Sequence, residues 1–337
     1  MANTNLNKAK ENKADEFYTQ LPDIENELRH YKEHFKGKTV LCNCDDPRVS
    51  NFFRYFALNF EHLGLKKLIC TCYKNADVDL FSQNEAEQAV YIVYEGNKDG
   101  DYLDFSEVEV IPLKGDGDFR SPECIELLKQ SDIVVTNPPF SLFREYVAQL
   151  MQYDKKFLIL GKMSALHYAD IFTLIMENKI WTGYGFNLSM VYKTPYENEL
   201  EANQKYVKSK GYDPNDNYIK VPAICWFTNL DTTKRCEELI MFKRYTPEGY
   251  PTYMNYDAIE VSKVTDIPMD YWGDMGVPDT FLDRYNPEQF EIIGLGCGDL
   301  AKKIGVTKNH RGRTDLAYTV DGVNKCPYSR IVIRRKK

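Results

Sequence analysis

Apolar and polar positions follow two different rhythms along the first two thirds of the chain. Short runs of aliphatic and β-branched residues, such as Thr39-Val-Leu-Cys-Asn43, are typical of buried strands. Between such runs, apolar residues recur at helical spacing, as at Phe52, Phe56 and Phe60. The predicted strands cover residues 39–43, 67–73, 89–94, 108–113, 132–136, 156–161 and 221–228, and the predicted helices cover residues 21–35, 48–63, 122–129 and 142–153.

This alternation of strands and helices predicts an α/β fold, with a parallel sheet that carries helices on both faces. Ligands in such folds bind beyond the carboxyl ends of the strands. Two loops lie at that edge, one after Asn43 and one after Thr136. We therefore expect the chemistry of the protein in these two loops.

The pattern changes beyond Asp231, where Tyr, Pro and Gly separate short irregular strands. We place a domain boundary between Leu230 and Cys236. The sequence therefore predicts a flexible arm at residues 1–14, a first domain at residues 15–232 and a smaller domain at residues 233–337.

Composition places the chain among ordinary globular proteins. Of the 337 residues, 43% are hydrophobic and 28% are charged. No apolar run is long enough for a membrane span, and the polar segment from Met1 to Asp15 lacks the apolar region of a signal peptide. The nine cysteines are an odd number and lie mostly in apolar runs, which favours a reducing, cytoplasmic location.

Two Cys-x-Cys pairs, Cys42/Cys44 and Cys70/Cys72, raise the question of a metal site. Zinc sites usually have a Cys-x2-Cys spacing or histidines at fixed distances, and neither accompanies these pairs. Two buried strands with cysteines on one face explain the same pattern, and we expect no metal.

Charge is distributed unevenly along the chain. The formal net charge is -7, yet residues 301–337 hold eleven Lys and Arg against two Asp. Such a basic end on an acidic chain is typical of phosphate binding by one region, although a solvated tail gives the same count.

The motif Asn137-Pro138-Pro139-Phe140 directly follows the predicted strand at residues 132–136. Two consecutive prolines fix φ and remove two backbone donors, so this segment joins neither a helix nor a sheet ladder. Its carbonyl groups stay available to a ligand, beside the side-chain acceptor of Asn137. The ring of Phe140 offers a flat face on which a base can stack.

These parts suit the methylation of an exocyclic amine. The lone pair of an adenine amino nitrogen is delocalised into the ring. If the Asn137 side-chain oxygen and the Pro138 carbonyl each accept one amino hydrogen, the nitrogen becomes more tetrahedral and its lone pair becomes available for attack on a methyl group. Placement and electrostatics then supply most of the catalysis. A target in duplex DNA must first be flipped out, and Phe140 would hold it by stacking.

The chain resembles a known family at this point. The Asn-Pro-Pro-aromatic motif is the signature of amino-methyltransferases with a Rossmann-like fold. More narrowly, six stretches are similar to the EcoRI-type adenine-specific DNA methyltransferases, and together they span nearly the whole chain: Asp15–Thr19, Val40–Pro47, Gly117–Arg120, Asp132–Ser141, Tyr285–Phe290 and Arg311–Tyr318. The resemblance implies a Rossmann-like methyltransferase sheet followed by a smaller DNA-recognition domain, with S-adenosylmethionine as cofactor and N6-methyladenine as product.

The resemblance also implies a set of cofactor-binding residues. They are Phe17, Tyr18, Thr19, Cys42, Asn43, Asp45, Asp46, Asp118 and Phe119. Asp118 would accept from the amino group of the cofactor's adenine, and Phe119 would pack on its face. The alternatives are that Thr19 caps a helix, that Asp45 or Asp46 caps the helix beginning near Pro47, and that Asp118 is an ordinary turn residue.

The cofactor segments depart from the commonest pattern at two places. The loop Cys42–Pro47 has no glycine, although this is the form seen in the EcoRI-like group. No acidic residue follows the second strand, where Thr71-Cys-Tyr-Lys74 stands, so the ribose contact is unassigned.

A glycine-rich stretch near the end, Phe290–Asp299, resembles a strand followed by a cofactor loop and raises the possibility of a permuted order of motifs. A permuted domain needs at least two further strands and helices after that loop, roughly 80 residues. The chain ends 38 residues later, so we assign this stretch to the second domain.

The sequence thus predicts a monomeric enzyme that acts on double-stranded DNA, possesses no membrane segment and is functionally paired with a restriction endonuclease. Its predicted DNA-binding residues are Lys308, Arg311, Arg313, Arg334 and Arg335. The resemblance suggests a palindrome such as GAATTC as the target. Two alternatives remain: a methyltransferase that acts on an RNA base or a protein glutamine, and a non-catalytic DNA-binding protein of the same fold.

Overall fold

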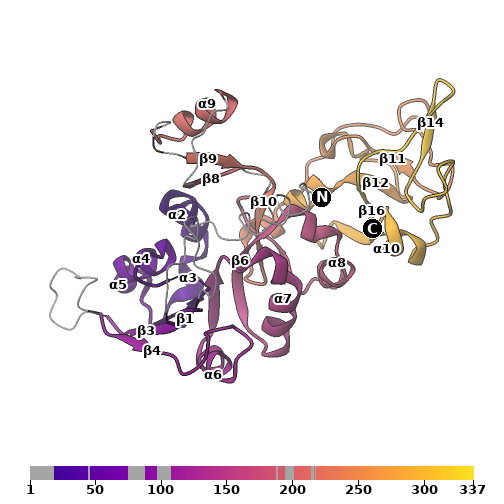
Figure 1. The fold of residues 1–337 in the computed structure, drawn as a ribbon. Coiled ribbons are helices and arrows are strands. Elements are labelled where there is room, and N and C mark those ends of the chain that lie inside the picture. The colour runs from indigo at the N-terminus through magenta and orange to yellow at the C-terminus, as the bar shows by residue number, and fades with distance from the viewer. Residues whose placement is uncertain are drawn as a thin grey trace, which may run out of the picture. The chain divides into compact units, whose positions relative to one another are not determined.

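A computed structural model of the chain describes residues 19–44, 46–74, 88–96, 108–186, 189–193, 201–213, 216 and 218–337. The predicted arm at residues 1–14 and the predicted cofactor residues Phe17, Tyr18 and Asp45 lie outside these ranges. The chain divides into two compact units (Figure 1). The first unit is Met1–Ala165 with Asn187–Leu230, and the second is Leu166–Phe186 with Asp231–Lys337.

The division differs from the predicted domains in one respect. The boundary after Leu230 falls inside the predicted interval, but residues 166–186 group with the second unit although they lie between two segments of the first. These residues include helix α8 (Ala169–Met176), which packs against strand β13 (Phe290–Leu295) of the second unit. Contacts made far away in the sequence therefore decide where this segment belongs.

A large mixed sheet organises the first unit. Its strands are β1 (Thr39–Asn43), β2 (Lys67–Cys72), β3 (Val90–Tyr94), β4 (Val110–Pro112), β5 (Ile133–Thr136), β6 (Lys156–Lys162) and β10 (Ile224–Thr228). Within this unit the strand order is β4-β3-β2-β1-β5-β6-β10. The four central strands, β2, β1, β5 and β6, are mutually parallel, as predicted.

The outer strands correct the expectation of an all-parallel sheet. β3, β4 and β10 run antiparallel to their neighbours. From Val90 to Val93 the side chains of β3 alternate between buried and half-buried positions, as they do in antiparallel strands with one solvated face. By contrast, every residue of β5 is buried.

The direction of the central crossovers reverses between β1 and β5. From β1 the chain passes through α4 (Asn51–Leu58) and α5 (Phe60–Leu63) to β2, and from β5 it passes through α7 (Phe143–Gln152) to β6. Because such crossovers are right-handed, these helices cover opposite faces, with α6 (Pro122–Gln130) on the side of α7 (Figure 1). The point of reversal is where folds of this kind bind ligands.

The helices begin and end at recognisable residues. The predicted helix at residues 21–35 is interrupted, with α2 (Leu21–Leu28), a 3-10 turn (Arg29–Tyr31) and α3 (Lys32–Phe35) in succession. The predicted helix at residues 48–63 begins at Asn51, because the Ser50 side chain caps it by accepting from the Phe53 amide. It breaks at Asn59 and ends at Gly64, which has a φ of 61°.

The predicted strand at residues 221–228 belongs to two elements. Val221 ends β9 (Tyr218–Val221), which pairs with β8 (Met190–Lys193), whereas β10 begins at Ile224. Between them Ala223 has a φ of 62°, so the chain turns there and cannot continue as one strand. Helix α9 (Glu201–Ser209) packs against β9.

The second unit is built on a smaller sheet with the order β11-β12-β16-β13. Its other strands are β11 (Ile259–Glu260), β12 (Met275–Pro278) and β16 (Arg330–Arg335), and β14 (Tyr318–Val320) pairs with β15 (Val323–Lys325) in a separate hairpin. Glu260 and Arg330 form an almost completely buried ion pair across this unit.

The glycine-rich stretch at residues 290–299 lies in this smaller sheet, where β13 runs antiparallel to β16. Packing explains two of its three glycines, since a Cβ at Gly296 would stand 2.5 Å from the Leu316 side chain and one at Gly294 would stand 2.7 Å from Ile304. The third, Gly298, has a φ of 66°. The permuted arrangement, which needs a parallel cofactor-binding strand here, is therefore excluded. Among the described residues, no helix has the length and apolar character needed to cross a membrane.

Candidate active site

The Asn137–Phe140 loop leaves the carboxyl end of β5 at the point of reversal in the large sheet. Asn137 is 7% exposed, Pro138 is buried and Pro139 is half-buried. Phe140 opens a 3-10 turn (Phe140–Leu142) that leads directly into α7. The motif is thus a short extended corner between a fully buried strand and a helix, as the prolines predict.

A buried polar group joins this loop to the end of β1. The Thr136 hydroxyl donates to the backbone carbonyl of Asn43, and the Tyr146 hydroxyl donates to the Asn43 side-chain oxygen. Burial raises the pKa of Tyr146 well above 10.0, so this hydroxyl remains a donor. The two sheet-edge asparagines, Asn43 and Asn137, are therefore held by neighbouring strands that are tied together.

Thr136 and Tyr146 were missed in the sequence analysis. Thr136 stands next to the Asn137–Phe140 motif, and a buried strand that ends in a hydroxyl residue is a signal that could have been used. Tyr146 lies among the apolar positions of α7, where its hydroxyl is indistinguishable from core packing until the partner on β1 is known.

The loop at residues 116–120 is pressed against the carboxyl end of β2. A Cβ at Gly117 would stand 2.5 Å from the Cys72 carbonyl oxygen and 2.7 Å from the Tyr73 Cα, and the φ of Gly117 is 78°. The Lys74 amide donates to the Asp116 carbonyl at 2.6 Å. Only glycine permits this approach, which brings Asp118 and Phe119 to the same edge of the sheet as Asn43.

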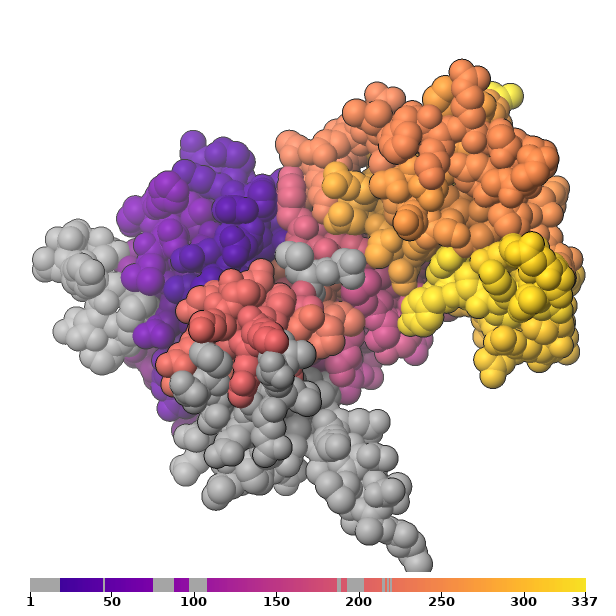
Figure 2. Space-filling view, turned by 90° about the horizontal axis from the view of Figure 1, so that it is seen from above, coloured from indigo at the N-terminus to yellow at the C-terminus, as the bar shows by residue number. Residues whose placement is uncertain are grey.

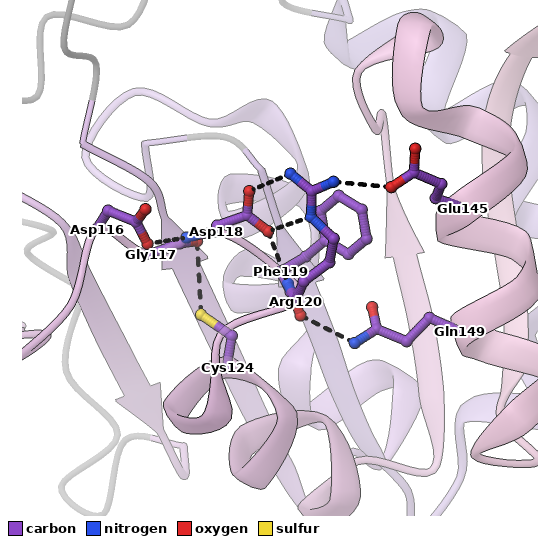
Figure 3. A network of polar contacts seen from close by, with 8 residues as sticks. All are labelled: Asp116, Gly117, Asp118, Phe119, Arg120, Cys124, Glu145 and Gln149. Atoms are coloured by element: carbon purple, nitrogen blue, oxygen red, sulfur yellow. Dashed lines mark hydrogen bonds and ion pairs between the residues drawn. The ribbon is translucent and has the colours of Figure 1, made fainter.

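Asp118 is an ion-pair residue as well as a turn residue. Its Oδ1 accepts from the Arg120 amide at 2.8 Å and from Arg120 Nε at 2.9 Å, and its Oδ2 accepts from Nη2 at 2.7 Å (Figure 3). The hydrogen bonds from Arg120 lower the pKa of Asp118, which keeps the carboxylate ionised and able only to accept.

Phe119 is mostly buried at the same place, with 7% of its surface exposed. Its ring packs edge-on against Tyr146, with centroids 4.9 Å apart. Its carbonyl accepts from Gln149 Nε2 at 3.0 Å (Figure 3). The Arg120 guanidinium lies 5.2 Å from the centre of the ring. The predicted Asp118–Phe119 pair is therefore held in place by contacts with Arg120, Tyr146 and Gln149.

Thr19 lies beside the start of α4, which follows the loop after β1. Its carbonyl accepts from Asn51 Nδ2 at 2.8 Å, and it forms an isolated bridge with Tyr192. The residue is 1% exposed, and within the described ranges its hydroxyl oxygen finds no hydrogen-bond partner. It does not cap the helix that follows it, since Gln20 is the N-cap residue of α2, which corrects the capping alternative.

The loop after β1 is shaped by Asp46. Its carboxylate accepts from the Arg48 amide at 3.0 Å and pairs with the Arg48 guanidinium at 2.5 Å. Asp46 is therefore turned toward its own loop, and it does not cap the helix, which begins three residues beyond the expected position. Cys42 is buried in β1, in register with Cys70 of β2.

Three of the four cysteines in the Cys-x-Cys pairs are strand residues. Cys42, Cys70 and Cys72 are all buried in β1 and β2, whereas Cys44 lies just past the end of β1 with a φ of 81°. Within the part of the chain that the structure describes, no group of three or more His, Cys, Asp or Glu side chains is arranged to hold a metal ion.

Lys162, at the carboxyl end of β6, is a further residue that the sequence analysis missed. Its Nζ lies 5.1 Å from the centre of the Phe140 ring, and Phe140 is 9% exposed. Lys162 itself is exposed to solvent. An exposed, charged side chain therefore contributes to the covering of the ring on which a base is expected to stack.

The predicted DNA-binding residues all belong to the second unit, and they fall into two groups. Arg334 pairs with Asp274 at 2.6 Å, and Arg335 stacks on Trp272 at 4.3 Å and donates to the Met269 carbonyl. Both are thereby engaged within the unit. The C-terminal residues gather mostly on one side of this unit (Figure 2).

Lys308, Arg311 and Arg313 form the other group, which we call the basic turn. All three are exposed, and no ion-pair partner for them occurs among the described residues. The buried side chain of Asn309 organises the turn, because its Oδ1 accepts from the amides of Arg311 at 2.8 Å and Arg313 at 3.2 Å. The turn is thus a fixed backbone that presents unpaired cations.

Comparison with known proteins gives one consistent result. The family described as the adenine-specific methyltransferase EcoRI matches residues 5–336. The Type II methyltransferase M.EcoRI of Escherichia coli is 48% identical over 336 residues, which cover 98% of this chain and 96% of that protein. No solved structure matches the chain.

Two mycoplasma proteins are similar over the same extent. The Type II methyltransferase M.MgeORF184P of Mycoplasma genitalium is 42% identical over 335 residues, covering 98% of this chain and 99% of the relative. The Type II methyltransferase M.MpnI of Mycoplasma pneumoniae is 39% identical over 338 residues, covering 98% of each.

Proposed function

The chain belongs to the adenine-specific EcoRI methyltransferase family and is a site-specific DNA methyltransferase, and from this premise we propose that it transfers the methyl group of S-adenosylmethionine to the N6 amino group of an adenine flipped out of double-stranded DNA. The observation that carries the proposal is the position of the Asn137–Phe140 loop. It leaves β5 at the reversal of the sheet, beside the end of β1.

Asn137 and Pro138 are the proposed acceptors for the two hydrogens of the adenine amino group. Accepting both hydrogens draws the nitrogen toward tetrahedral geometry and localises its lone pair. The contact of Thr136 with Asn43 and the rigid prolines fix these acceptors before the base arrives, so no reorganisation is needed during the reaction. Phe140 supplies the stacking surface, and Pro139 holds the corner extended.

The residues of the cofactor region fit an adenosyl ligand. Asp118 is an ionised acceptor, Phe119 is an aromatic neighbour, and Thr19 has a buried hydroxyl that lacks a partner among the described residues. Bound there, S-adenosylmethionine supplies an activated methyl group. We propose that Phe17, Tyr18 and Thr19 hold its methionine end and that Cys42, Asn43, Asp45 and Asp46 line the loop beside it.

The basic turn is the proposed phosphate-binding element. Lys308, Arg311 and Arg313 are exposed and have no partner within the described part of the chain, whereas Arg334 and Arg335 would have to exchange contacts with Asp274 and Trp272 to reach DNA. Phosphate contacts of this kind position a protein on a duplex, and base contacts specify the sequence. We propose that the protein binds DNA as a monomer in the cytoplasm, beside a cognate endonuclease with which it forms no stable contact.

The test is transfer of a tritiated methyl group from S-adenosylmethionine to unmethylated genomic DNA, followed by mapping of the modified bases. We expect label on N6 of adenine at one short sequence, with GAATTC as the first sequence to examine. RNA and a glutamine-containing peptide serve as competing acceptors. Labelling of either in preference to DNA, or cofactor binding without any transfer, would contradict the proposal.

A further inference from the structure

Arg120 joins the cofactor loop to the helix that follows the catalytic loop (Figure 3). Its Nη2 and Nε donate to the two carboxylate oxygens of Asp118 at 2.7 and 2.9 Å. Its Nη1 donates to Glu145 of α7 at 2.7 Å. A planar guanidinium can make these contacts together, whereas the single ammonium of a lysine cannot.

Two further contacts run between the same elements. Gln149, one turn after Glu145 on α7, donates to the Phe119 carbonyl at 3.0 Å, and Tyr146 of the same helix packs against the Phe119 ring. Residues 145, 146 and 149 lie on one face of a helix at spacings of one, three and four. One face of α7 thus holds the loop that carries Asp118 and Phe119.

Backbone contacts also hold this loop on the sheet. Gly117 fixes the loop on β2 through its backbone, and the Arg120 side chain is about half exposed, so its burial contributes little. The contacts of Arg120 instead set the direction of the Asp118 carboxylate. Three of its four acceptor positions are taken by Arg120, which leaves the remaining one in a fixed direction.

We propose that Arg120 is a positioning residue, which rests on the proposed function: it aims the free acceptor of Asp118 so that the site selects a cofactor whose purine ring carries an amino group. The discrimination arises because a ligand with a carbonyl in place of the amino group would set two acceptors against each other. Glu145 contributes by holding the guanidinium from the other side.

The experiment compares S-adenosylhomocysteine with S-inosylhomocysteine, in which a carbonyl replaces the adenine amino group, as calorimetric ligands of the full chain. We expect the wild-type protein to bind S-adenosylhomocysteine about tenfold or more tightly than S-inosylhomocysteine. This is the size expected when a ligand loses a hydrogen bond to a charged group, here the Asp118 carboxylate. Arg120→Ala should reduce that preference to about twofold, Arg120→Lys should restore part of it, and Glu145→Gln should give an intermediate value.

Kinetics supply a readout that a merely structural role would not give. We expect Arg120→Ala to raise the KM for S-adenosylmethionine about tenfold while kcat stays within about twofold. Lys129→Ala is the matched control, since Lys129 lies on neighbouring α6 and its ammonium contacts only Glu126 and Tyr153 among the described residues. It should leave both the preference and the KM unchanged.

The outcomes separate the two proposals. Full preference for S-adenosylhomocysteine in Arg120→Ala overturns the role of Arg120, even when the wild-type protein methylates adenine. Failure of the wild-type protein to bind either ligand overturns the cofactor assignment itself. If Arg120→Ala does not fold, Arg120→Lys and Glu145→Gln decide, because unaltered preference in both contradicts the inference.

Discussion

At the scale of single residues, the site depends on a few polar groups buried among apolar neighbours. Asn43 is the clearest case, since its backbone and side-chain oxygens accept from Thr136 and Tyr146 respectively. An unsatisfied buried acceptor costs about 1–3 kcal/mol, so the Tyr146 hydroxyl is more important to stability than its single hydrogen bond suggests.

Replacing Tyr146 with Phe should therefore lower the free energy of unfolding by about 1–3 kcal/mol and slow methyl transfer. Because burial raises the pKa of Tyr146 above its usual 10.0, both folded and unfolded chains keep this group neutral below about pH 9. The difference in unfolding free energy between the wild type and Tyr146→Phe, measured by urea unfolding, should be constant from pH 6 to pH 9. Above pH 10 the Tyr146 hydroxyl ionises in the unfolded wild-type chain before it does so in the folded one. This lowers the stability of the wild type, so its advantage over Tyr146→Phe should become smaller.

A stability difference that grows above pH 10, or a Tyr146→Phe variant as stable as the wild type, would contradict this account of Tyr146. Phe is the appropriate replacement because it keeps the ring that packs against Phe119. The comparison thus isolates the hydroxyl from the packing.

Lys162 gives a second prediction for a single residue. Its ammonium lies over the Phe140 ring and should compete with a flipped base for that surface. A cation–π contact at an exposed site is worth about 0.5–1 kcal/mol, which corresponds to about two- to fivefold in an equilibrium. With 2-aminopurine at the mapped target, Lys162→Ala at saturating protein should increase the flipped fraction by about that factor.

Lys156→Ala, at the opposite end of the same strand, is the control and should have no effect on the flipped fraction. Unchanged or weaker fluorescence in Lys162→Ala would show that Lys162 does not cover the stacking surface.

At the scale of elements, the loop at residues 116–120 is positioned by a close approach of backbone to backbone. Gly117 is both in the left-handed region and too near β2 for a side chain. Gly115, two residues earlier, has no such φ, and a Cβ added there would meet nothing within 4 Å. These two glycines form a matched pair for testing how the loop is held.

Gly117→Ala should lower the free energy of unfolding by about 2 kcal/mol or more, from the left-handed φ and the contact with Cys72. It should also weaken binding of S-adenosylhomocysteine, since the loop must move away from β2. Gly115→Ala should stay within about 0.5 kcal/mol of the wild type. Equal effects of the two substitutions in urea unfolding would refute the close approach.

The sequence predicted the elements best where local pattern and burial agree. The central strands and the ends of α6 were correct to within a residue or two because apolar runs, a serine cap and a proline mark them. The predictions of a parallel β3 and of one continuous strand at residues 221–228 were wrong. Strand direction and a positive φ at a non-glycine residue such as Ala223 depend on tertiary contacts that no local pattern records.

The residues of the candidate site also fall into those that a local pattern reveals and those that it does not. The Asn137–Phe140 motif is contiguous, so a catalytic role for it could be proposed from the sequence alone. The residues that support it come from separate elements: Thr136 and Tyr146 contact Asn43, and Arg120 contacts Glu145, across 25 or more positions. Only the folded chain brings such residues together.

At the scale of the whole molecule, the exposed basic side chains of the basic turn and the Asn137–Phe140 loop belong to different units. The chain carries a net charge of -7, yet the basic turn lies in the second unit and the Asn137–Phe140 loop lies in the first. Changing Lys308, Arg311 and Arg313 together to Gln should weaken DNA binding at all sequences. The dependence of log K on log salt should become shallower by up to about 2.7, while affinity for S-adenosylhomocysteine is retained.

Lys179→Gln is the control for the basic turn, because Lys179 lies in the same unit and is already paired with Glu177. A salt dependence that is identical in the triple variant and the wild type would mean that DNA contacts another surface.

The most direct test of the central claim is single-turnover methyl transfer by Asn137→Ala, measured on the mapped duplex together with calorimetric binding of S-adenosylhomocysteine. Removing a preorganised polar group of this kind costs about 10²–10³ in rate. We predict a loss of at least that size, with cofactor affinity within about threefold of the wild type. A methylation rate within tenfold of the wild type would contradict the account.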